Sequence, residues 1–175
     1  MSPFSPKTSK PEGLTLIELI VVIVIIAILA TIAVPGFGEM IKNNRVSSQN
    51  NELVSIITFA RSEAIRRSTD VTIAIDPTSD GWVAMVFVGP DDTGPTLRET
   101  SNARVSLTNS AEGNLVTFNS RGYIKRANDL DGTFFDSETV SIRLEHVGCN
   151  GSRQARLMEL LPTGQISSKS EGCKL

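Results

Sequence analysis

The stretch Leu14–Val34, LTLIELIVVIVIIAILATIAV, determines how the rest of this sequence is interpreted. Eighteen of its 21 residues are hydrophobic. As an α-helix it is about 31 Å long, close to the roughly 30 Å of a bilayer's hydrocarbon core. It is longer than the apolar part of an ordinary secretory signal peptide, and it runs into Pro35-Gly36 without a small-residue cleavage site. The stretch is therefore predicted to cross a membrane once.

The rest of the chain has the composition of one soluble domain. The chain has 175 residues, of which 40% are hydrophobic, and a formal net charge of −2. This composition excludes the disordered, collagen-like and coiled-coil classes. Before the apolar stretch, Lys7 and Lys10 stand against Glu12, which favours a cytoplasmic N-terminus. The C-terminal domain is then expected across the membrane, where cysteines can pair.

Glu18 is the one charged residue in the apolar stretch. A carboxylate at the centre of a membrane helix costs on the order of 2.5–3.5 kcal/mol on insertion scales, and less near an end. Glu18 lies near an end, so it either reaches the lipid head groups or pairs with a positive charge. Position alone leaves both readings open.

The motif Gly13-Leu14-Thr15-Leu16-Ile17-Glu18-Leu19, after a short basic leader, resembles the class III signal of type IV prepilins and type II secretion pseudopilins. The resemblance implies that a prepilin peptidase cuts after Gly13 and N-methylates Leu14. It also implies assembly roles for Glu18 and for Pro35, a position where pilins commonly have proline. The new ammonium group at Leu14 would lie within one helical turn of Glu18 and could pair with it, or with the same carboxylate of a neighbouring subunit.

After Pro35-Gly36 the pattern changes to an amphipathic helix, expected over about 37–67. Its apolar stripe is Leu53, Ile56, Ile57, Ala60 and Ala64, and its polar part, Lys42–Asn51, is expected to be poorly buried.

From Val71 onward, short β-type runs alternate with turns rich in glycine, proline and aspartate. The expected strands are Val71–Ile75, Trp82–Val88, Arg104–Leu107, Leu115–Asn119, Gly122–Arg126, Val140–Val147, Ala155–Leu161 and Gln165–Ser168. The fold class is α+β, with a pilin-like long N-terminal helix packed on an antiparallel sheet. The expected divisions are a leader (1–13), a membrane or filament-core helix (14–35), its amphipathic continuation (36–70) and a β-rich globular domain (71–175).

Three further segments narrow the resemblance. Phe59–Ala64, Val71–Ile75 and Val116–Gly122 are similar to the family of FimT and FimU minor pilins and GspH pseudopilins. The FimU type implies a structural subunit that helps to initiate or cap a type IV pilus; a GspH-type secretion pseudopilin and a FimT-type DNA-binding pilin are the alternatives. Arg61 and Glu63 are interpreted as solvated helix charges, with a specific contact to another subunit as the alternative.

The resemblance also implies partners and a location. The partners are prepilin peptidase, other minor pilins or pseudopilins, the major subunit and the inner-membrane assembly platform. The location is the bacterial inner membrane, crossed once with the C-terminal domain in the periplasm, and then a surface pilus or a periplasmic pseudopilus.

Sequence signatures of enzymes are absent, so no catalytic, cofactor-binding or metal-binding residue is assigned. His146 lies near Cys149, but a strand-end histidine next to an oxidised cysteine explains this pair better than a nucleophile does. A disulfide is expected between Cys149 and Cys173, where closing the loop would contribute on the order of 3–4 kcal/mol. Asp91-Asp92 and Asp129–Gly132 are interpreted as turns because neither has the spacing of a calcium loop.

The sequence argues against a nucleic-acid partner. The resemblance would place the Gly-Arg-x-Arg motif of DNA-binding FimT members in the C-terminal hairpin, where this chain has Gly164-Gln165-Ile166-Ser167. Both arginines are missing. From Arg143 to Leu175, five basic residues stand against three acidic ones, a net of +2. Few phosphates could be neutralised by so small an excess.

Processing at Gly13 is the first testable prediction. The intact mass of the protein from membranes should correspond to a chain that begins at methylated Leu14, and Gly13→Leu should leave the full-length precursor. A protein that still begins at Met1, in cells with an active prepilin peptidase, would contradict the resemblance.

Overall fold

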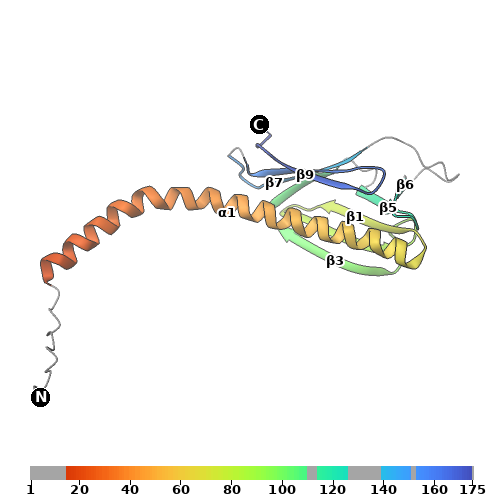
Figure 1. Cartoon of the computed structure of the whole chain (residues 1–175), viewed down its shortest axis with the longest axis horizontal. Coiled ribbons are helices and arrows are strands. Elements are labelled where there is room, and N and C mark those ends of the chain that lie inside the picture. The colour runs from red at the N-terminus through yellow and green to blue at the C-terminus, as the bar shows by residue number, and fades with distance from the viewer. Residues whose placement is uncertain (1–14, 110–113, 126–138, 151–152, 175) are drawn as a thin grey trace, which may run out of the picture. The chain divides into compact units, whose positions relative to one another are not determined.

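The computed structural model describes residues 15–109, 114–125, 139–150 and 153–174, with the backbone alone at 32–35. The chain divides into two compact units, Met1–Gly38 and Glu39–Leu175. Helix α1 (Leu16–Arg67) contributes to both of them (Figure 1). The nine strands found in the described residues all belong to the second unit, which is the globular part of the molecule.

The described residues contain no single helix that is both long enough and apolar enough to cross a membrane. Two segments of α1, Leu16–Thr31 and Gly36–Arg67, pass that test together, by length and composition only. The predicted crossing by the stretch 14–35 remains a prediction, because residue 14 and the side chains of 32–35 lie outside the described part.

The C-terminal end of α1 has a defined cap. Arg66 and Arg67 lie in the last turn, where positive charge interacts favourably with the helix dipole. The Ser68 N–H donates to the carbonyl of Ile65, and the Thr69 N–H donates to that of Ala64. These two bonds, with Ser68 in the left-handed region at φ 53°, form a Schellman motif that ends the helix and turns the chain into the first strand.

The strands form two antiparallel sheets rather than the single sheet that the sequence suggested. The first has the order β3-β2-β1-β5-β6 and the second has the order β4-β7-β8-β9. In chain order the strands are β1 (Val71–Pro77), β2 (Gly81–Val88), β3 (Thr96–Ala103), β4 (Val105–Asn109), β5 (Leu115–Phe118), β6 (Ile124–Lys125), β7 (Val140–His146), β8 (Ala155–Leu160) and β9 (Ile166–Glu171).

Most of the predicted strands are confirmed with small shifts, and two predictions need correction. The run Gly122–Arg126 was expected to be a strand, but Gly122 is in a turn, only Ile124–Lys125 pairs, and Arg126 lies outside the described residues. Strand β3 was not expected. Its sequence, TLRETSNA, has no alternation of apolar and polar residues by which a strand could be predicted. In the structure each of these residues is half-buried or exposed.

The apolar stripe of α1 is confirmed as the side that faces the core. Leu53, Ile56, Ile57, Ala60 and Ala64 are all at most 1% exposed. They pack in one cluster with side chains of both sheets, which include Ile73, Trp82, Val105, Phe118, Ile142 and Met158. One helix face therefore serves as the common packing surface for two sheets.

The prediction that Lys42–Asn51 is poorly buried is wrong for three of its residues. Val46, Gln49 and Asn50 are buried. The Gln49 side-chain amide donates to the carbonyl of Ala103 (3.0 Å) and accepts from the Trp82 indole (2.9 Å), which connects α1 to the first sheet. The Asn50 side chain accepts from the Ser168 hydroxyl (2.9 Å), which connects α1 to the second.

The Gln49 amide generates the second prediction. Gln49→Ala leaves the buried Trp82 N–H without its acceptor, so it should lower the free energy of unfolding by about 1–3 kcal/mol. Asn51→Ala, at an exposed position of the same helix, is the matched control and should stay within about 0.5 kcal/mol. Urea unfolding of the full chain in mild detergent, followed by fluorescence of the single tryptophan, measures both. Equal effects of the two variants would contradict the role given to Gln49.

Candidate assembly segment

Helix α1 begins with a side-chain cap. The Thr15 hydroxyl accepts the Glu18 N–H (3.3 Å), and the Thr15 carbonyl accepts the Leu19 N–H (3.2 Å). Thr15 is therefore the N-cap, and Glu18 lies in the first turn, where a carboxylate is favoured by the helix dipole. The predicted cleavage residues, Gly13 and Leu14, lie outside the described part of the chain.

The sequence interpretation missed the role of Thr15. The signal for it was present, because a threonine three residues before a glutamate, ahead of an apolar run, is the pattern of a capping box. The cap fixes the start of the helix two residues after the predicted cleavage site. In the sequence, Glu18 is the fourth residue after the predicted new N-terminus, Leu14.

Beyond the cap, α1 exposes a long run of large apolar side chains. Twelve of them between Leu16 and Leu29 are 45–76% exposed. A contiguous apolar surface of this kind requires lipid or other protein chains as its environment. The helix continues through Pro35 in its backbone, but the Pro35 side chain is not among those described.

In the globular unit, Arg61 holds together three segments that are distant in the sequence. Its Nε donates to the carbonyl of Gly122 (3.0 Å), in the turn between β5 and β6. Its Nη2 donates to the carbonyl of Thr163 (3.1 Å), in the turn between β8 and β9. The interpretation of Arg61 as a solvated charge is therefore wrong: its guanidinium joins α1 to one turn of each sheet.

Asn119 shapes the first of these two turns. Its side-chain oxygen accepts the N–H groups of Arg121 (2.9 Å) and Tyr123 (3.1 Å). The backbone carbonyl of Asn119 accepts the Gly122 N–H (2.8 Å), and Gly122 adopts φ +79°. Asn119 thus holds the Gly122 carbonyl where Arg61 can bind it.

The second turn is the hairpin at Pro162-Thr163-Gly164, as predicted. The Gly164 N–H donates to the carbonyl of Leu161 (2.8 Å), and Gly164 adopts φ +75°. The two turns also touch directly, since the Ile124 N–H donates to the carbonyl of Pro162 (2.9 Å).

Glu63 is also an ion-pair partner rather than a solvated charge: its side chain is 12% exposed, whereas those of Arg66 and Arg67 are 64% and 37% exposed. Its carboxylate accepts hydrogen bonds from Arg66 (2.6 Å) and Arg67 (2.6 Å) on the same helix. The bonds from Arg66 and then Arg67 lower the pKa of Glu63 to about 2. The same contact raises the pKa of Arg66. One carboxylate against two guanidinium groups leaves a net charge of +1 next to the C-terminal cap of α1.

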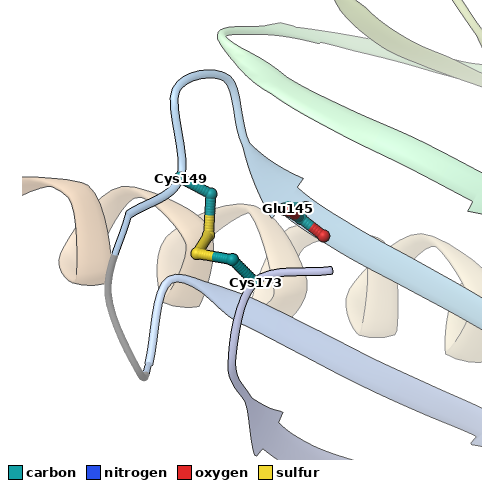
Figure 2. Close-up of side chains that lie close together, drawn as sticks. All are labelled: Glu145, Cys149 and Cys173. Carbon is teal, nitrogen blue, oxygen red and sulfur yellow. A yellow bond between two sulfur atoms is a disulfide. The ribbon is translucent and has the colours of Figure 1, made fainter. Parts of the chain in front are cut away.

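Cys149 and Cys173 form the predicted disulfide, with their Cα atoms 5.7 Å apart. Figure 2 shows Glu145 beside it, and a carboxylate oxygen of Glu145 lies within 4.8 Å of both sulfur atoms. The disulfide occupies both sulfurs, so this trio offers no thiolate to a metal ion. His146, at the end of β7, has its Nδ1 at 2.6 Å from the carbonyl of Val147.

Two acidic segments were predicted to be turns, and the structure describes only the first of them. Asp91 accepts the N–H (3.0 Å) and the hydroxyl (2.7 Å) of Thr93, which makes the predicted turn. The Thr93 hydroxyl, and then its backbone N–H, lower the pKa of Asp91. Asp129–Gly132 lies outside the described residues.

Two family models match the chain. The model described as "Type II transport protein GspH" covers residues 49–164, and the prokaryotic N-terminal methylation motif covers residues 9–34. The chain belongs to the GspH family. The GspH match takes in Arg61, Asn119 and both turns that Arg61 joins. No curated protein sequence matches this GspH-family chain.

Solved structures agree on the fold. The GspH-family chain is similar to two crystal forms of the type IV minor pilin FimU from Pseudomonas aeruginosa (strain PAO1). The form in space group P65 has 19% identity, a TM-score of 0.51, and coverage of 70% of this chain and 91% of FimU. The form in space group P21 has 20% identity, a TM-score of 0.52, and coverage of 72% of this chain and 89% of FimU. The pilin fold expected from the sequence is thereby confirmed.

The contact between the two turns generates the third prediction. A Cβ atom at residue 164 would lie 2.4 Å from the Gly122 carbonyl oxygen, whereas a Cβ at residue 148 would meet nothing within 4 Å. Both glycines have nearly the same φ, +75° and +79°. Gly148→Ala should therefore cost only the left-handed strain, about 1–2 kcal/mol. Gly164→Ala should cost about 1–3 kcal/mol more, because backbone must move.

Urea unfolding of both variants in mild detergent measures the difference. Since the two substitutions share the backbone conformation, a difference in stability reports the crowding between the turns. Equal losses in the two variants would show that the second turn yields easily and that Arg61 does not hold a fixed arrangement.

Proposed function

We propose that this chain is a minor pilin, a structural subunit that helps to initiate or cap a type IV pilus with other minor pilins. The observation that carries the proposal is the capped helix start: an N-cap at Thr15, Glu18 in the first turn, and twelve exposed large apolar side chains behind them. A helix of this kind serves as a membrane anchor before assembly and as an apolar filament core afterwards. The role is structural and not catalytic.

The charges support a defined register between subunits. After cleavage at Gly13 by prepilin peptidase, methylated Leu14 would carry an ammonium group next to the N-cap Thr15. Glu18 is exposed in its own chain and can pair with that group or with the ammonium of a neighbouring subunit. A desolvated charge that must find its partner favours one axial position over others. The inner-membrane assembly platform and the major subunit are the further partners of this proposal.

The proposed location follows from the same segment. The chain would span the bacterial inner membrane once, with 36–70 continuing the helix and 71–175 in the periplasm. Later it would join a surface filament. Within the described residues, the disulfide Cys149–Cys173 supports an oxidising compartment for the globular unit.

A role as a GspH-type minor pseudopilin of a type II secretion system is the second candidate. The observation that favours it is the family model, whose own description is a type II transport protein. The two roles use the same helix and differ in the machine that the subunit joins.

Glu18 provides the test. In the bacterium that produces the chain, Glu18→Gln should insert into the membrane at wild-type levels yet reach assembled filaments at least tenfold less, because the charge that seeks the neighbouring ammonium is gone. Glu39→Gln, which removes an exposed carboxylate from the same helix outside the apolar run, should assemble normally. Immunoblots of membrane and filament fractions measure both.

Three outcomes are informative. Wild-type protein in sheared surface filaments supports the pilus role, whereas protein confined to the periplasm together with a secretion defect on deletion supports the pseudopilus role. Glu18→Gln at wild-type levels in filaments would show that the carboxylate is merely tolerated.

A further inference from the structure

Strand β7 holds the C-terminal end of the described chain. We call Glu171–Lys174 the C-terminal arm; it includes the end of the edge strand β9 and carries Cys173. The guanidinium of Arg143, on β7, donates to the Glu171 carboxylate and to the carbonyl of Gly172. The Lys174 N–H donates to the carboxylate of Glu145 (3.4 Å), also on β7. Contacts from β7 therefore lie on both sides of Cys173.

The other cysteine is positioned by the same strand. Cys149 follows β7 by three residues, and its N–H donates to the carbonyl of His146 (2.9 Å), which closes a turn. Both sulfur positions are thus set from β7: that of Cys149 through a turn, and that of Cys173 through Arg143 and Glu145. Figure 2 shows the disulfide between these two segments, with Glu145 on β7, the strand that leads to Cys149.

Arg143 differs from an ordinary surface arginine. Its side chain is only 8% exposed, and its Nε donates to Glu145 (3.0 Å) while another nitrogen reaches Glu171. If the arm moved away, this guanidinium would lose the Glu171 carboxylate and the Gly172 carbonyl, and removing a partner from a largely buried charge is unfavourable. The pair Lys169–Glu159 on the same sheet, with side chains 55% and 36% exposed, imposes no such penalty.

We propose that Arg143 and Glu145 form a non-covalent clamp that holds Cys173 against Cys149 before the disulfide exists. Arg143 is then a positioning residue for the oxidation of this chain. The inference is independent of the assembly role, because it concerns only the globular unit.

The covalent step itself needs a disulfide donor of the glutathione or protein-disulfide class. One cysteine thiolate attacks the donor and forms a mixed disulfide, releasing one donor thiol; the second cysteine thiolate then displaces the other donor thiol. The two cysteines lose two electrons and two protons, and the donor disulfide becomes two thiols. The clamp takes no part in electron transfer. It raises the effective concentration of one thiol near the other.

The first experiment removes the covalent bond and keeps the clamp. In the full chain with Cys149→Ser and Cys173→Ser, in mild detergent, hydrogen exchange should show the amides of 168–174 still protected. Adding Arg143→Gln to this chain should increase their exchange at least tenfold, and adding Arg153→Gln, at an exposed arginine, should not. An unprotected arm in the double-serine chain with Arg143 intact would overturn the proposal.

The second experiment measures the thiol pair directly. The full chain is equilibrated with reduced and oxidised glutathione, and the disulfide fraction is determined by thiol alkylation and mass. Arg143→Gln should lower the effective concentration of the pair at least tenfold relative to wild type and to Arg153→Gln. Arg143→Lys should fall in between, because an ammonium cannot reproduce the fork of a guanidinium.

Equal effective concentrations in Arg143→Gln and Arg153→Gln would overturn the clamp. Tryptophan fluorescence, which reports the buried Trp82, checks that each variant is folded. If Arg143→Gln does not fold, the exchange measurement on the double-serine chain decides, because it leaves Arg143 unchanged.

Discussion

The burial of one face of α1 between Val46 and Ala64 is the constraint on which the globular unit depends. A helix face can pack against two sheets only if it offers each sheet both apolar surface and hydrogen-bond partners. The apolar area comes from residues such as Leu53 and Ile57. The partners come from Gln49, which binds the first sheet, and from Asn50, which binds the second. Polar side chains near the middle of the helix are thus part of the packing.

Arg61 adds a further polar contact three turns closer to the C-terminal end of the helix. Its guanidinium has a rigid fork of donors, so two carbonyls from different sheets can be bound at once. The segments Phe59–Ala64 and Val116–Gly122, which carry the family resemblance in the globular part, are the segments that make one half of this contact. The family signal in this region therefore has a direct physical meaning: it marks the place where the helix and a turn are held in register.

The sequence predicted the features that depend on apolar periodicity. The stripe from Leu53 to Ala64 and the strands with Val, Ile or Leu at alternating positions needed no tertiary information. The disulfide between Cys149 and Cys173 was predicted from the expected location of the domain across the membrane and from the positions of the two cysteines in the sequence. Strand β3 was missed because its side chains are mainly polar: Thr100 and Asn102 contact Glu52 on the helix, and Arg98 lies 5.5 Å from the ring centre of Phe59.

The functional residues likewise divide into those that local sequence predicts and those that only the tertiary structure reveals. Glu18 stands out in the sequence because a charge interrupts an apolar run, and Thr15 was identifiable from its spacing to Glu18. The contacts of Arg61, Gln49 and Arg143 were not identifiable, since each of them binds residues more than 25 positions away in the chain. Polar residues whose partners are set by tertiary structure look like solvated residues until the fold is known.

The long sequence separations also determine when this protein can fold. Helix α1 contacts its partners at separations of 102 to 118 residues, in the bonds of Arg61, Ser47 and Asn50. At the usual synthesis rate of about 5–20 residues per second, on the order of ten seconds pass between the emergence of the helix and that of its last partners. Until then β8 and β9 cannot complete the second sheet's cover over the apolar stripe, whereas the amino-terminal segment is already synthesised. The order of biosynthesis thus completes the amino-terminal segment first and leaves the packing of the last strands, β8 and β9, until the end of synthesis.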